Sequence, residues 1–158
     1  MKKPKVFIIM GSKSDMPIVE KASEIFKDFG VAYEIVVSSA HRQPAQTHAI
    51  ATSLERKGVD VVIAAAGKAA HLPGVVASWC SIPVIGLPIS AAPLNGIDSI
   101  LSIVQMPSGV PVACVGINEA KNAALLAIQI LSIKYGNLKK KFKNYKNSMA
   151  SSKKGRYK

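Results

Sequence analysis

The chain has 158 residues, of which 49% are hydrophobic but only 6% aromatic, so we expect one domain with a core of Ala, Val and Ile. Its formal net charge of +12 lies in the tail: residues 1–119 carry ten Lys or Arg and nine acids, whereas residues 120–158 carry eleven and none. No apolar stretch of about 18 residues is unbroken and no signal-peptide core follows the basic start, so we expect a cytoplasmic protein without a membrane span.

Short β-branched runs alternate with segments of helical spacing. Strands are expected at residues 5–10, 31–37, 60–65, 83–87 and 111–115. Asp15-Met16-Pro17 predicts a helix start, with a possible cap from Asp15, and Gly30 its end. Further helices are expected from Pro44 to Gly58, over 72–80, 95–104 and 119–135, with the last ending at Gly136.

This alternation predicts an α/β fold in which a parallel sheet has helices on both faces. Burial of both faces explains why the strands are continuous apolar runs rather than alternating ones. We predict a domain over residues 1–136 and a basic, partly helical extension over 137–158 whose final dozen residues are disordered. The run from Lys139 to Lys146 could bind nucleic acid, but we favour a solvated helix end followed by a frayed tail from Ser148.

Three of the apolar runs end in small and polar residues, and parallel strands bring such loops to one edge of the sheet. After the first run, Gly11 permits a tight turn, while Ser12 and Ser14 add hydroxyls near a helix start. This loop suits a phosphate monoester, with Asp15 either capping the helix or reaching a ribose hydroxyl. It is neither a GxGxxG nor a Walker loop.

The second loop places an imidazole beside a guanidinium. Arg42 suits a phosphate because its planar fork matches two oxygens, and His41 is the natural proton carrier near neutral pH. His48 lies inside a predicted helix and is expected to be structural or exposed. The third loop, Gly67 to Gly74, has few bulky side chains, and its His71 could orient a substrate or bind nearby backbone.

Metal and acyl-enzyme chemistry find no support in these loops, because they contain no clustered ligands and no Ser-His-Asp order. The cysteines Cys80 and Cys114 show no metal-ligand spacing and are expected to be reduced and buried.

Four motifs in unbroken order resemble bacterial N5-carboxyaminoimidazole ribonucleotide mutases of de novo purine synthesis. They are Met10-Gly11-Ser12-Lys13-Ser14-Asp15, Ser39-Ala40-His41-Arg42-x-Pro44, Ala69-Ala70-His71-Leu72-Pro73-Gly74 and the segment from Ser102 to Val112. The resemblance implies a flavodoxin-like three-layer α/β/α fold, a homo-octamer and an isomerase without cofactor or metal. The implied reaction moves a carboxyl group from an exocyclic nitrogen to ring carbon C4 through trapped carbon dioxide.

The same resemblance assigns roles to individual positions. His41 becomes the proton shuttle, with His71 as its catalytic companion. The substrate-binding positions are Gly11, Ser12, Ser14, Asp15, Ser39, Ala40, Arg42, Gly67, Lys68, Ala69 and Leu72. Among these, Ser12, Ser14, Asp15 and Arg42 correspond to ribose-phosphate contacts, and the loop from Gly67 to Gly74 lines the base and carbon dioxide pocket.

One position departs from the family's usual Gly-Gly-Ala-Ala-His-Leu-Pro-Gly, because Lys68 replaces the second glycine. If that position requires a positive φ, Lys strains the loop by roughly 1 kcal/mol or more. Its cation could also reach the substrate carboxylate.

Three alternatives stay open at this point. A sister enzyme would carboxylate aminoimidazole ribonucleotide directly, but its third loop differs. A non-catalytic nucleotide-binding module would tolerate His41→Asn. A nucleic-acid-binding protein would lose its function on truncation after Gly136, whereas the mutase would largely keep its catalysis if assembly survives.

Overall fold

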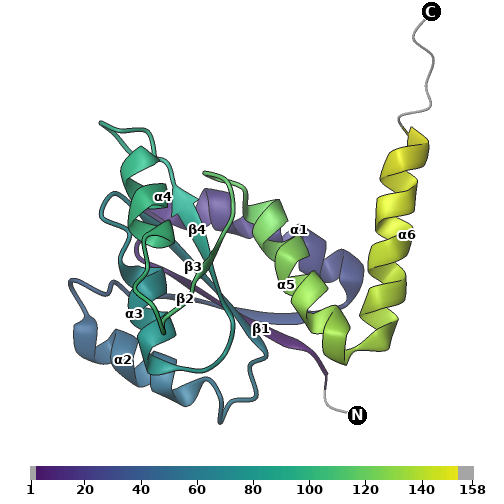
Figure 1. The fold of residues 1–158 in the computed structure, drawn as a ribbon, viewed down its shortest axis with the longest axis horizontal. Coiled ribbons are helices and arrows are strands. Elements are labelled where there is room, and N and C mark those ends of the chain that lie inside the picture. The colour runs from purple at the N-terminus through teal and green to yellow at the C-terminus, as the bar shows by residue number, and fades with distance from the viewer. Residues whose placement is uncertain (1–2, 153–158) are drawn as a thin grey trace, which may run out of the picture.

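The protein is described by a computed structural model over residues 3–152, in which five parallel strands form one sheet between two layers of helices (Figure 1). The strands are β1 (Lys5–Met10), β2 (Ala32–Val37), β3 (Val61–Gly67), β4 (Val84–Ile89) and β5 (Ala113–Cys114). The helices are α1 (Met16–Phe29), α2 (Pro44–Ser53), α3 (Leu72–Trp79), α4 (Ile97–Val104), α5 (Ala120–Lys134) and α6 (Gly136–Ser152), with a 3-10 turn η1 (Lys13–Asp15).

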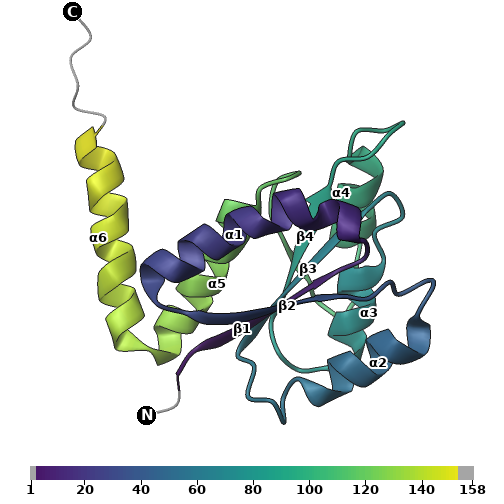
Figure 2. The ribbon, with the colours of Figure 1, turned by 180° about the vertical axis from the view of Figure 1, so that it is seen from behind.

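The strand order is β2-β1-β3-β4-β5, the flavodoxin-like order, which confirms the predicted fold class. Alternate side chains of β1 enter opposite cores: Val6 and Ile8 face α1 and α5, whereas Phe7 and Ile9 face the layer of α2, α3 and α4. All four are buried. The two views in Figures 1 and 2 show these helices on the two faces of the sheet.

Several element boundaries differ from those predicted. The fourth helix begins at Ile97 rather than at residue 95, because Asn95 and Gly96 have φ values of 51° and 93°. The second helix ends at Ser53, and separate turns lead to Gly58. The expected strand over 111–115 shortens to two residues at the edge of the sheet.

Helix α1 begins and ends close to the predicted positions, but Asp15 does not cap it. Gly30 ends the helix with φ 69°, as its sequence position indicates. The Asp15 carboxylate makes no capping hydrogen bond and accepts one from the Ser14 hydroxyl at 3.2 Å instead.

The basic extension forms α6, which runs beside α1 and α5 at the side of the molecule away from α2 and α3 (Figures 1 and 2). Leu138 is buried in the core shared by α1 and α5. Lys141 Nζ donates to the Phe29 carbonyl oxygen at 2.9 Å, and Tyr145 stacks edge-on against Phe29. Residues 148–152 are helical and not the frayed tail that was predicted from Ser148, and the rest of that tail, residues 153–158, lies outside the described range.

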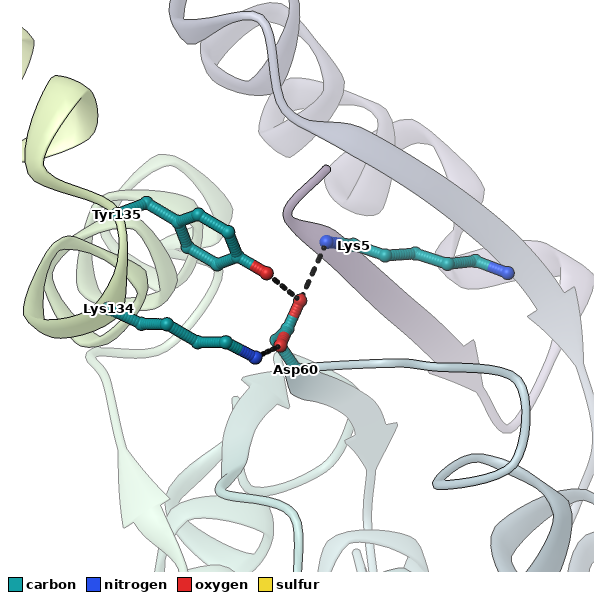
Figure 3. Close-up of polar contacts among 4 residues, drawn as sticks. All are labelled: Lys5, Asp60, Lys134 and Tyr135. Atoms are coloured by element: carbon teal, nitrogen blue, oxygen red, sulfur yellow. Dashed lines mark hydrogen bonds and ion pairs between the residues drawn. The ribbon is translucent and has the colours of Figure 1, made fainter. Parts of the chain in front are cut away.

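At the amino end of the strands, the Asp60 carboxylate joins β1, β3 and the α5–α6 junction (Figure 3). It accepts hydrogen bonds from the backbone N–H of Lys5 at 3.1 Å, from Lys134 Nζ at 2.8 Å and from the Tyr135 hydroxyl at 3.1 Å. Burial alone would raise the pKa of Asp60, but these donors outweigh it and hold that pKa below its ordinary value.

Cys80 and Cys114 are free thiols, but each is half-buried rather than buried as predicted. Burial raises the pKa of both thiols, which keeps them protonated near neutral pH. None of the helices over the described residues is long and apolar enough to cross a membrane.

Candidate active site

The loops that follow the strands surround a cavity of about 730 Å³ at the carboxyl edge of the sheet. All of the predicted site residues line it, drawn from the ends of β1, β2 and β3. They are Gly11, Ser12, Ser14, Asp15, Ser39, Ala40, His41, Arg42, Gly67, Lys68, Ala69, His71 and Leu72. The structure therefore brings together all the residues of the predicted site, while their roles stay predictions.

The loop after β1 presents two hydroxyls to the cavity. Ser12 Oγ accepts hydrogen bonds from the Ser14 backbone N–H at 3.3 Å and the Ser14 hydroxyl at 2.8 Å. Beside them, burial raises the pKa of the Asp15 carboxyl, and hydrogen bonds from Ser14 and the Ser12 backbone offset part of this. Gly11 is not in the left-handed region, and a Cβ at this position would meet only the Ala65 carbonyl oxygen, at 4.0 Å. The sequence predicted a turn that depends on glycine, but the backbone here would accept other residues.

The loop after β2 is fixed by a buried hydrogen bond to α2, and its Arg42 side chain contacts the loop after β1. Ser38 and Thr47, both fully buried, share a hydrogen bond of 2.8 Å that fixes the start of α2 under the loop. Ser39 Oγ accepts from the Arg42 backbone N–H at 3.3 Å. The Arg42 guanidinium donates to the Gly11 carbonyl oxygen at 3.3 Å, which sets it beside the serine hydroxyls.

Two imidazoles meet across the cavity. His41 Nε2 and His71 Nδ1 lie 2.9 Å apart, and the rings meet edge to face with centroids 4.9 Å apart. One nitrogen of this contact carries the shared proton and the other accepts it. His71 thus binds His41 rather than neighbouring backbone through its side chain, which gives the pair a built-in route for a proton.

His48 lies outside this cavity, as predicted. It is exposed on α2, where its ring meets Trp79 of α3 edge-on at a centroid distance of 4.2 Å.

The loop after β3 carries the departure noted in the sequence. Lys68 has a φ of 55°, in the left-handed region that glycine adopts without strain. The preceding Gly67 lies close to β4, since a Cβ on it would be 3.1 Å from the Ile89 carbonyl oxygen. The sequence analysis expected strain at Lys68 if this position has a positive φ, and the structure shows that it does.

Sequence reasoning missed the cavity's far wall, which comes from the ends of β4 and β5. Ser90, Ala91 and Asn118 line it, and Asn118 Oδ1 accepts a hydrogen bond from the Ser90 backbone N–H at 2.9 Å. The strand-end argument applied to the first three strands would have found Ser90 and Ala91. Within residues 3–152, no group of three His, Cys, Asp or Glu side chains could hold a metal ion.

Comparisons with known proteins agree with this architecture. A protein from Pyrococcus abyssi named N5-carboxyaminoimidazole ribonucleotide mutase is 58% identical over 92% of this chain and 84% of its own length. A Thermotoga maritima protein of the same name is 55% identical over 92% and 85%. The crystal structure of Treponema denticola PurE superposes with a TM-score of 0.85 at 34% identity, covering 98% of this chain and all of that one.

The model of the family described as AIR carboxylase matches residues 5–152, which includes every strand, every helix and each loop around the cavity. The chain belongs to the AIR carboxylase family.

Proposed function

We propose that this chain is an isomerase of de novo purine synthesis that interconverts N5-carboxyaminoimidazole ribonucleotide and 4-carboxy-5-aminoimidazole ribonucleotide. The relatives that carry the mutase name support this activity over the whole folded chain. One observation carries the chemistry: an imidazole pair 2.9 Å apart shares a cavity with two serine hydroxyls and an arginine guanidinium.

The proton balance of the reaction fits such a pair. Cleavage of the carbamate N–C bond leaves its electrons on the exocyclic nitrogen, which takes up one proton, and releases carbon dioxide. Ring carbon C4 then attacks carbon dioxide, and loss of the C4 proton restores aromaticity. One proton is gained and one is lost, with no change of oxidation state, so a single acid–base residue suffices.

We assign this proton to His41 and give His71 the role of holding that ring and sharing its proton. Ser12, Ser14 and Arg42 are proposed to bind the phosphate, since hydroxyls and a guanidinium suit its oxygens. Asp15 is proposed to accept from the ribose hydroxyls. Anchoring a phosphate and a ribose supplies binding energy away from the reacting atoms and holds the small ring in place.

The test is an assay of the purified protein with the carbamate nucleotide and, separately, with aminoimidazole ribonucleotide plus bicarbonate. We expect efficient conversion of the carbamate nucleotide. His41→Asn is expected to lower kcat at least about 100-fold, because general acid–base catalysis contributes that much, with nucleotide affinity changed by less than about threefold.

His48→Asn is the matched control, since it removes an imidazole outside the cavity and should leave kcat unchanged. If the protein converts aminoimidazole ribonucleotide with bicarbonate but not the carbamate nucleotide, the proposed mutase activity is wrong and the protein is a direct carboxylase. A His41→Asn variant with the kcat of the wild type would remove His41 from the mechanism. A wild-type protein that binds the nucleotide but converts neither substrate would favour a binding module.

We further propose that the chain works as a homo-octamer in the cytoplasm. Self-assembly is supported by a stripe of exposed apolar side chains on and before α4, namely Leu94, Ile97, Leu101 and Val104, each between 46% and 56% exposed. Such contiguous apolar surface is typical of protein interfaces. A cytoplasmic location is supported by the phosphorylated substrate, because a charged nucleotide does not cross membranes unaided.

A further inference from the structure

Lys68 holds a backbone conformation that a lysine adopts only at a cost. Its φ of 55° lies in the left-handed region, where the Cβ approaches the carbonyl oxygen that follows it. Glycine would meet no such penalty at this position. Non-glycine residues in this region cluster at ligand sites, where the side chain justifies the strain, so an observed outlier is a reason to look for its use.

The side chain at this position carries a charge that nothing in the described part of the chain neutralises. Lys68 is exposed and lines the cavity. The ion pairs within residues 3–152 involve Lys5, Lys121 and Lys134, not Lys68. Its ammonium is therefore free to meet a ligand.

The cavity contains two cations at different strand ends. Arg42 is held at the side of β1 and β2, where it donates to Gly11 O and lies near Ser39 Oγ at 3.5 Å. Lys68 follows β3, which lies on the other side of β1 from β2 in the sheet. Asp15 is the carboxylate among the lining residues, and burial raises the pKa of that group. This arrangement suits a ligand with two separate anionic groups.

We propose that the Lys68 ammonium binds the carboxylate of the nucleotide, while Ser12, Ser14 and Arg42 hold its phosphate. This rests on the proposed function, which supplies a ligand with those two anions. Lys68 is then a specificity residue that distinguishes carboxylated nucleotides from aminoimidazole ribonucleotide, which lacks the carboxylate.

The pairing also predicts which kinetic constant depends on Lys68. The Lys68 ammonium attracts the substrate carboxylate but not neutral carbon dioxide. The contact therefore stabilises the bound substrate more than the intermediate stage, in which the carboxyl group has left as carbon dioxide. Removing the charge should therefore raise KM without lowering kcat.

The experiment measures nucleotide affinity by titration calorimetry with the full-length protein. The two probes are 4-carboxy-5-aminoimidazole ribonucleotide and aminoimidazole ribonucleotide. For Lys68→Met we expect the Kd of the carboxylated probe to rise about tenfold, the usual scale of a charge-assisted hydrogen bond, and that of the other probe to change less than about twofold. Lys68→Arg keeps the charge and should keep the discrimination.

Two further variants separate charge from local structure. Lys13→Met removes an exposed lysine from the neighbouring loop that does not line the cavity, and should leave both affinities unchanged. Lys68→Gly removes the charge and the backbone strain together, and should lose the same discrimination as Lys68→Met. It also serves if the methionine variant fails to fold.

Equal weakening of both probes in the Lys68 variants would show that the residue shapes the loop or binds phosphate, and would overturn the proposal. Unchanged affinities would overturn it as well. A wild-type protein that binds neither probe would instead refute the proposed function, an outcome visible before any variant is compared.

Discussion

The left-handed φ of Lys68 destabilises the folded state, because the unfolded chain does not have to adopt that angle. A left-handed lysine costs about 1 to 2 kcal/mol, whereas glycine avoids this but loses about 0.5 to 1 kcal/mol through the greater freedom of the unfolded chain. The difference between these two costs favours glycine at φ 55° by up to about 1.5 kcal/mol, with a midpoint of about 0.75 kcal/mol.

Lys68→Gly should therefore raise Tm by about 2 °C and leave kcat equal to or above that of the wild type. Scanning calorimetry and the carbamate-nucleotide assay measure the two quantities. Lys13→Gly is the control: Lys13 lies in η1 without a positive φ, so the same change there should lower Tm. A lower Tm for Lys68→Gly would contradict the strain argument.

Among the elements, the contact made by Asp60 is the one most sensitive to pH. Its carboxylate is 11% exposed and accepts from three donors on β1, α5 and the residue that follows α5. Because these donors hold the pKa of Asp60 below its unfolded value of about 3.9, the ionised group favours the folded state. This stabilisation is fully present above that unfolded value and is lost as the pH falls through the lower, folded one.

Asp60→Asn should cost about 2 kcal/mol at pH 7, which corresponds to a fall in Tm of about 4–8 °C. The difference from wild type should shrink as the pH falls below about 4. Thermal unfolding across this pH range measures it. Glu34→Gln removes the other partner of Lys5, a partly exposed ion pair with an N–O distance of 3.3 Å, and should cost less than about 1 kcal/mol. A difference that is constant with pH would mean that the Asp60 charge is unimportant.

Helix α6 was expected in part, but its basic composition concealed how it packs against the core. Leu138, Phe142 and Tyr145 are four and three residues apart, a helical apolar stripe, but they stand among five lysines that suggested a solvated tail. In the structure Leu138 is buried and both rings contact Phe29. Truncation after Gly136 therefore removes core contacts as well as the basic residues, whereas the sequence-based expectation of largely retained catalysis depended only on the survival of assembly.

For the molecule as a whole, the exposed stripe on α4 lies close to the candidate active site. A second hollow of about 420 Å³ is lined by Leu101 of α4, by Met106 and by His71 of the imidazole pair. A neighbouring subunit that covers α4 would therefore also approach His71, so assembly and catalysis are expected to depend on each other.

Leu101→Glu should break the proposed octamer, because it introduces a charge on the exposed surface that this assembly would bury. Light scattering after gel filtration should give the mass of an octamer for wild type and a smaller species for this variant, with reduced kcat. Leu101→Met, which keeps the surface apolar, should remain octameric. An octameric Leu101→Glu variant would exclude α4 from the interface.

The sequence predicted the layered fold and most of the residues that line the cavity, because both depend on strong local signals. Apolar runs ending in serine, histidine and arginine mark strand ends, and parallel strands bring those ends together. The contribution of Asn118 could not be predicted, because this residue lies four positions beyond the end of β5 and reaches the cavity only through the path of the intervening loop. The contact between His41 and His71 joins residues 30 positions apart, and only the packing of two loops reveals it.

The Asp60 carboxylate lies where β1 and β3 start, and the ligand cavity lies where the same strands finish. Each strand spans roughly 20 Å, about two screening lengths at physiological salt. Charge changes at one end should thus be scarcely felt at the other, and thermostability and catalytic rate could be altered separately in this scaffold.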